Sequence, residues 1–184
     1  MRFRHSAGFG RRIEFWIIGQ MLKEGLDVYV PLVDDNAIDA VVRRGPGSFV
    51  EIQIKARSRD VKEGNAALFA AIPHNELRSD YWFVFYSERL EKMWIMTSQE
   101  FLAESYENKN GKNAGLCAIW FNGTRKNRED GKREEYAKER YRRYEATSFK
   151  RILEVPDGSA TEVASPGGSR AREPSPDLSP AVVV

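Results

Sequence analysis

Residues 49–56 (FVEIQIKA) alternate strictly between apolar and polar side chains, and this pattern limits the possible folds more than any other feature of the chain. Successive side chains of a β-strand point to opposite faces, so Glu51, Gln53 and Lys55 would share one face of a strand. An acid, an amide and a lysine in a row are unusual on a face that a sheet would bury. The segment therefore predicts a strand with a strongly polar face.

A second strand is predicted just before it, over residues 37–43 (AIDAVVR). This run is mostly β-branched and apolar, with Asp39 in its first half. Residues 44–48 (RGPGS) follow and supply the turn between the two runs. Asp34 and Asp35, which precede the first run, have ordinary turn chemistry. The whole stretch predicts two short strands joined by a turn.

The polar face of this hairpin has two interpretations. In the first, an amphipathic hairpin exposes the face to solvent, which is the commoner cause of such alternation. In the second, the face is a metal site in which a lysine holds the charge of a phosphate. The rest of the sequence has to decide between them.

Composition limits the class of protein. A chain of 184 residues, 41% hydrophobic and 30% charged, is typical of one soluble domain with a real core. Its apolar runs are too short to span a bilayer, and its N-terminus lacks the apolar core of a signal peptide, so we expect a cytosolic protein without a membrane partner. The single Cys117 excludes an intrachain disulfide and a cysteine-based zinc site.

The last thirty residues, 155–184, differ in character from the rest. They contain five Pro, five Ser and three Gly but no aromatic residue. Such a segment buries too little apolar surface to offset its ordering entropy, so we predict a disordered tail after a single domain over 1–154. The tail carries a net charge of −2, which leaves +4 on the predicted domain, a balance compatible with a polyanionic partner.

Residues 9–24 predict the first helix, which Gly25 ends as a C-terminal cap. Glu14 falls near the middle of the apolar stripe of this helix at 100° per residue. A carboxylate there is costly unless a cation meets it, whereas a position in the first turn, near the positive helix end, would make it unremarkable. The residues of the stripe are Ile17, Ile18, Met21 and Leu22.

The predicted strands and helices together indicate an α/β fold, in which helices pack on a sheet. Thr97 and Glu100 form a capping box, which marks the start of a short helix. We expect further strands at 26–33, 81–86, 92–96 and 115–121, helices at 66–77, 101–106 and 132–153, and a basic loop at 122–131.

Three of these segments carry a motif in a fixed order: Gly10-x-x-x-Glu14 on the helix, Ile38-Asp39 on a strand, and Glu51-Ile-Gln-Ile-Lys55 on the next strand. Over about residues 8–90 the chain resembles the PD-(D/E)XK nuclease superfamily. The match is best to the branch in which Gln replaces the second acid, which includes Mrr-like restriction endonucleases and small uncharacterised bacterial nuclease domains. The resemblance implies a restriction-endonuclease-like αβββαβ core, with a central mixed sheet flanked by helices.

The resemblance also implies a role for each residue of the motif. Asp39 would be the main ligand of Mg²⁺, with Mn²⁺ as a possible substitute, and Gln53 would offer its amide oxygen where relatives place an acid. Lys55 would orient the nucleophile and counter phosphate charge, and Glu14 would reach the ion from the helix. Because Gln53 is neutral, Glu51 is a further possible metal ligand.

The implied partner is DNA, and RNA is not excluded. Arg57, Arg59 and Lys62 follow the lysine-bearing strand and are candidates for contacts with backbone phosphates, although exposed basic residues are common. A homodimer is possible, because cutting both strands of a duplex commonly takes two sites.

Two other hypotheses stay open. A nuclease fold that has lost activity would serve as a nucleic-acid-binding or protein-interaction module, and the neutral Gln53 favours this. An unrelated domain with a polar sheet face would place Glu14 far from Asp39. His5 and His74 have no partners at catalytic spacing.

Overall fold

The computed structural model describes residues 6–33, 36–127 and 131–154. The predicted tail at 155–184 and the predicted turn residues Asp34 and Asp35 lie outside these ranges. Within them, no helix has the length and apolar content that crossing a bilayer requires.

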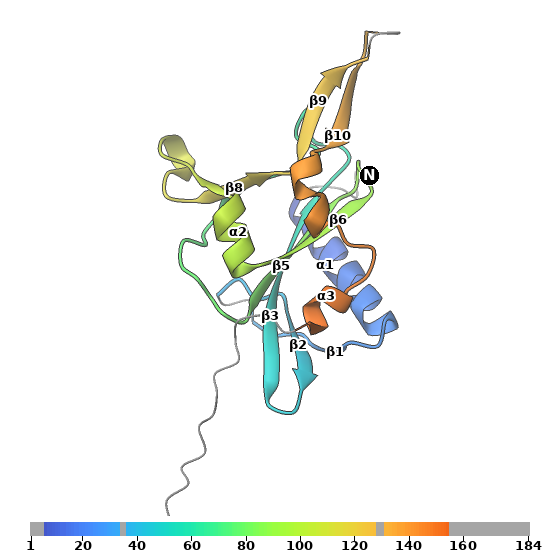
Figure 1. Ribbon diagram of the computed structural model, residues 1–184, viewed down its shortest axis with the longest axis vertical. Coiled ribbons are helices and arrows are strands. Elements are labelled where there is room, and N and C mark those ends of the chain that lie inside the picture. The colour runs from blue at the N-terminus through green and yellow to red at the C-terminus, as the bar shows by residue number, and fades with distance from the viewer. Residues whose placement is uncertain (1–5, 34–35, 128–130, 155–184) are drawn as a thin grey trace, which may run out of the picture. The chain divides into compact units, whose positions relative to one another are not determined.

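A mixed five-stranded sheet forms the centre of the fold (Figure 1). Its strands are β1 (Asp27–Tyr29), β2 (Ala40–Gly45), β3 (Ser48–Arg57), β5 (Tyr81–Ser87) and β6 (Lys92–Thr97). They lie in the order β1-β2-β3-β5-β6, in which β3 and β5 run parallel and the other neighbours are antiparallel. The predicted α/β class with a central mixed sheet is confirmed.

Helix α1 (Ser6–Lys23) covers one face of this sheet. Val50, Ile52 and Ile54 of β3, which alternate with the polar residues, point to this face and pack in one core with the helix. The predicted stripe of α1 is buried except at Leu22, which is 53% exposed because it lies at the edge of the stripe, about 140° from Ile17 around the helix. Buried residues of this layer include Ile17, Ile18, Met21, Val50, Ile52 and Ile54.

The opposite face of the sheet is aromatic. Tyr81, Phe83 and Phe85 of β5 lie in a second core with residues of a three-stranded sheet and a helix. These elements are β4 (Leu68–Ile72), β7 (Tyr106–Glu107), β8 (Cys117–Trp120) and α2 (Ser98–Glu104). Helix α2 begins at the predicted capping box, since the Thr97 hydroxyl accepts from the Glu100 amide and the Glu100 carboxylate from the Thr97 amide.

The helix predicted at 66–77 is wrong. Its alanine-rich sequence has high helix propensity, but β4 instead pairs with β8, and Ala71 has a φ of 60° at a break in that pairing. The connection between the parallel strands β3 and β5 therefore contains a strand and no helix.

The loop predicted at 122–131 and the helix predicted at 132–153 are also wrong. Most of this region is an antiparallel ribbon followed by short helical turns. The Tyr136 ring lies on Gly123, where a Cβ would come within 2.7 Å of it, so the pairing depends on a contact across the ribbon. The elements are β9 (Asn122–Lys126), β10 (Arg133–Ala137), the 3-10 helices η1 (Gly111–Asn113) and η2 (Glu139–Tyr144), and α3 (Lys150–Leu153).

Candidate active site

Asp39 lies immediately before β2, against the middle of β3. Its amide donates to the Ile52 carbonyl at 2.9 Å, and its Oδ2 accepts a hydrogen bond from the Ile54 amide at 2.6 Å. Asp39 is only 8% exposed. Its carboxylate is therefore fixed at the backbone of the residue that separates Gln53 from Lys55.

Gln53 and Lys55 point to the aromatic face of the sheet. In the parallel pairing of β3 with β5, Gln53 lies beside Phe83 and Lys55 beside Phe85. Gln53 is 3% exposed, and its amide makes no hydrogen bond to any residue that the structure describes. Lys55 is partly buried and has no ion pair within the described ranges. The site thus contains a buried amide and an ammonium without protein partners there.

Glu14 is on α1, which packs on the other face of the sheet. Its side chain is 20% exposed, in keeping with its predicted place near the apolar stripe. Arg11 Nη1 donates to its Oε2 at 2.9 Å, so the helix itself supplies the cation that a partly buried carboxylate needs. The structure brings Asp39 to Gln53 and Lys55, and the convergence of Glu14 with them stays a prediction.

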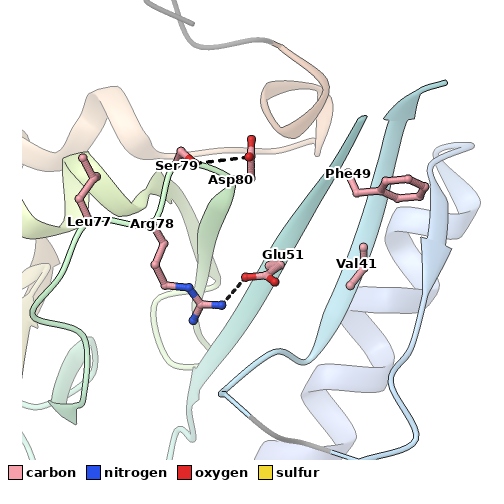
Figure 2. Close-up of a pocket in the computed structure, with 7 residues that line it drawn as sticks. All are labelled: Val41, Phe49, Glu51, Leu77, Arg78, Ser79 and Asp80. Carbon is pink, nitrogen blue, oxygen red and sulfur yellow. Dashed lines mark hydrogen bonds and ion pairs between the residues drawn. The ribbon is translucent and has the colours of Figure 1, made fainter. Parts of the chain in front are cut away.

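Glu51 forms an ion pair with Arg78, and Figure 2 shows the two side chains pointing toward one another. This pair is part of a pocket of about 510 Å³, lined by Val41, Phe49, Glu51 and residues 77–80. The charge of Glu51 is thus already balanced by a guanidinium. Its predicted role as a further metal ligand would require it to leave this partner.

The three basic residues predicted to contact phosphates differ in their surroundings. Arg57 Nε donates to the Leu68 carbonyl, and burial lowers the pKa of its guanidinium, so this side chain ties β3 to β4. Arg59 is exposed, with Nε 3.4 Å from Glu88 Oε1, and Lys62 is exposed. Phosphate contacts by the three side chains stay a prediction, with Arg59 and Lys62 the more accessible.

The donors near Asp39 suit a hard divalent cation. Nowhere in the described ranges do three or more His, Cys, Asp or Glu side chains group as a metal site. An ion here would therefore depend on the Asp39 carboxylate together with the Gln53 amide oxygen and backbone carbonyls, which are all oxygen ligands of the kind that Mg²⁺ prefers. The Gln53 side chain makes no hydrogen bond within the described ranges, so its amide oxygen is available to such an ion.

Two further residues contact the turn before Asp39 and were not predicted from the sequence. Arg78 Nη1 donates to the Asn36 carbonyl at 3.1 Å, and the Tyr81 hydroxyl donates to the Ala37 carbonyl at 2.6 Å. The Arg78 guanidinium also lies 3.8 Å from the centre of the Tyr81 ring. Arg78 belongs to a loop without periodicity, and the sequence predicts Tyr81 only as a residue of a buried strand. No sequence pattern therefore indicates a role for either residue.

No protein family model and no curated protein matches the chain. Among solved structures it is similar to a bacterial homing endonuclease, I-Ssp6803I, with a TM-score of 0.44 and 18% sequence identity. The superposition covers 61% of this chain and 86% of the endonuclease chain. A similarity this distant transfers no activity to this chain.

Proposed function

We propose that this chain is a metal-dependent nuclease of PD-(D/E)XK type that hydrolyses phosphodiester bonds of DNA. One observation carries the proposal: the Asp39 carboxylate is fixed on the Ile54 amide, between a buried, unbonded Gln53 amide and a Lys55 without an ion pair in the described ranges. An amide and an ammonium that lie side by side without protein partners in the described ranges are available to a ligand, so their presence together favours a binding role.

Asp39 and Gln53 would hold Mg²⁺ or Mn²⁺, with Glu14 as the second carboxylate of the predicted motif. When bound, the ion supplies positive charge beside the phosphate and a deprotonated water. Lys55 would place its ammonium against the phosphate oxygens and stabilise the negative charge that develops on them. Arg59 and Lys62 would contact neighbouring phosphates of the strand.

Cleavage of single- and double-stranded DNA, and of RNA, in the presence and absence of Mg²⁺ or Mn²⁺ tests this function. We expect metal-dependent cleavage that Lys55→Ala and Asp39→Asn each lower by ~100-fold or more, because the first removes the cation that would stabilise the phosphate and the second removes the carboxylate that would hold the ion. Lys23→Ala, which removes an exposed lysine at the end of α1, is the matched control and should cleave normally. Absence of metal-dependent cleavage, or equal rates for wild type and Lys55→Ala, would sink the proposal.

The second candidate is a module that binds nucleic acid without cutting it. It is favoured by the neutral Gln53 and by the Arg78 partner of Glu51, because both leave the site with less negative charge for a metal ion. Calorimetric titration with Mg²⁺ and gel shifts in EDTA separate the two. The nuclease binds the ion and loses it in Asp39→Asn, whereas the module binds DNA without any ion.

A further inference from the structure

The turn that leads into Asp39 has an unfavourable backbone conformation. Asn36 and Ala37 have φ angles of 59° and 57°, so two successive residues other than glycine lie in the left-handed region. Asparagine tolerates this region, but the Cβ of alanine crowds the backbone there. Such a turn persists only where its surroundings hold it in place.

Contacts from one cluster hold this turn. The Tyr81 hydroxyl bonds to the Ala37 carbonyl at 2.6 Å, and Arg78 bonds to the Asn36 carbonyl at 3.1 Å. Tyr81 is 1% exposed and is the first residue of β5, where it pairs with Glu51 of β3. Arg78 is in turn fixed by its ion pair with Glu51 (Figure 2). Its guanidinium also lies over the Tyr81 ring. The Tyr81 donor therefore belongs to β5, and the Arg78 donor is held by Glu51 of the neighbouring parallel strand β3.

We propose that Arg78 and Tyr81 are positioning residues, which hold the strained turn so that the Asp39 carboxylate stays on the Ile54 amide, ready to bind the metal ion. In this arrangement Glu51 anchors Arg78 and is not a ligand of the ion. The inference rests on the proposed function. It adds two residues that would support metal binding indirectly, through the position of Asp39.

Loss of either contact should release the turn and let the Asp39 side chain leave its place. Residues that orient a metal ligand without touching the metal commonly change its affinity by about 10- to 100-fold when they are substituted. We therefore expect Tyr81→Phe, which removes one hydroxyl and keeps the buried ring, to bind Mg²⁺ and Mn²⁺ about 10-fold more weakly. Arg78→Ala should have at least this effect.

Two measurements test the inference on the full chain. Calorimetry with Mg²⁺ or Mn²⁺ alone gives the affinity of the ion, with Asp39→Asn showing that the ion binds at Asp39. Hydrogen exchange at the Asp39 and Ile54 amides, which are bonded to Ile52 O and to Asp39 Oδ2, reports whether the turn is held. In both variants these two amides should exchange faster than in wild type. Cleavage should fall in kcat and not in KM for DNA, and excess Mn²⁺ should restore it.

A similar trio on the neighbouring strands provides matched controls. The Tyr29 hydroxyl donates to Asp27 Oδ2 at 3.3 Å, and Arg43 Nη1 lies 3.6 Å from the same oxygen. These side chains are exposed, and neither of these two contacts involves the turn before Asp39. Tyr29→Phe and Arg43→Ala should leave metal affinity and the exchange of both amides as in wild type.

The change in metal affinity of Arg78→Ala distinguishes this inference, which predicts weaker binding, from a ligand role for Glu51, which predicts tighter binding. If Glu51 binds the ion, Arg78→Ala frees its carboxylate and tightens metal binding, which overturns the inference. Unchanged affinity and exchange in Tyr81→Phe also overturn it, and this variant decides the matter if Arg78→Ala does not fold. If wild type binds neither ion, the proposed function fails, and exchange at the two amides alone decides whether the turn is positioned.

Discussion

Two buried side-chain amides lie on different parts of this fold, and their surroundings are opposite. Asn122, at the base of the β9–β10 ribbon, is 0% exposed, and Gln53, on β3, is 3% exposed. The Gln53 amide has no hydrogen-bond partner among the residues that the structure describes. The Asn122 amide has four: it donates to Gly64 O at 3.0 Å and Glu135 Oε1 at 3.3 Å, and accepts from Ala67 N at 2.9 Å and Trp120 Nε1 at 2.8 Å.

The difference separates a structural polar group from one suited to a ligand. A fully bonded buried amide joins segments that no apolar contact would align, and the Asn122 bonds join the β9–β10 ribbon to residues 64–67. The Gln53 amide has no such bonds to the described residues, yet it is not among their fully buried unbonded atoms, which are Arg44 Nη2, Trp82 Nε1 and Trp94 Nε1. Its polar atoms are therefore not tied to the protein, and an ion bound there would stabilise the fold.

Of the substitutions at these two amides, Asn122→Leu should have the largest effect on stability. The substitution keeps a side chain of similar size but leaves the buried Ala67 amide without its acceptor, while the Trp120 indole N–H and the Gly64 carbonyl keep only the bond to each other. We expect the free energy of unfolding to fall by roughly 3 kcal/mol or more, measured by urea denaturation. A loss below about 1 kcal/mol would show that water replaces these bonds and that Asn122 is not the structural member of the comparison.

Gln53→Met is the corresponding change at the other amide. It removes the unbonded polar atoms and keeps the length of the side chain beside Phe83. In EDTA, the free energy of unfolding should stay within about 1 kcal/mol of wild type or rise, while Mg²⁺ no longer stabilises the protein as it should stabilise wild type. A destabilisation as large as that of Asn122→Leu would mean that Gln53 is structural, and would remove the main support for the metal site.

The candidate site was predictable from sequence because its signal is local. Alternation over 49–56 places Gln53 and Lys55 on one face, and a turn-forming sequence brings the preceding strand with Asp39 beside them. The distance along the chain is short, so hairpin geometry alone nearly fixes the arrangement. Glu14 was placed correctly near the apolar stripe of α1, but its position relative to Asp39 depends on how helix and sheet pack, which periodicity does not determine.

The second layer was not predictable in the same way. Residues 66–77 are rich in helix-forming alanine, and Asn122 begins a segment whose polar composition is typical of a loop. Both become strands because of partners far along the chain, β8 in one case and β10 in the other. Arg78 and Tyr81 act on Asp39 through single bonds across more than forty positions to Asn36 and Ala37, and such contacts leave no periodic trace.

His74 is a third buried polar side chain and sharpens the comparison, since its burial disfavours the charged state of the ring. It is 5% exposed, its Nε2 lies 2.7 Å from Ser98 Oγ, and its ring stacks on Tyr81. Burial, with a smaller effect of the Arg78 charge, lowers the pKa of His74 from 6.5 to about 4.

This pKa shift makes stability depend on pH. Between pH 6.5 and 4 the unfolded chain binds a proton on His74 that the folded chain does not, so stability falls as pH falls through this window and is unaffected above it. His74→Gln removes the titrating ring, and its urea unfolding should show a shallower loss between pH 7 and pH 5 than wild type. Ser98→Ala keeps the ring and should keep the steep loss while lowering stability throughout. If the free energy of unfolding falls equally steeply with pH in wild type and in His74→Gln, the folded protein accommodates the charged ring, and burial of His74 does not exclude its charge.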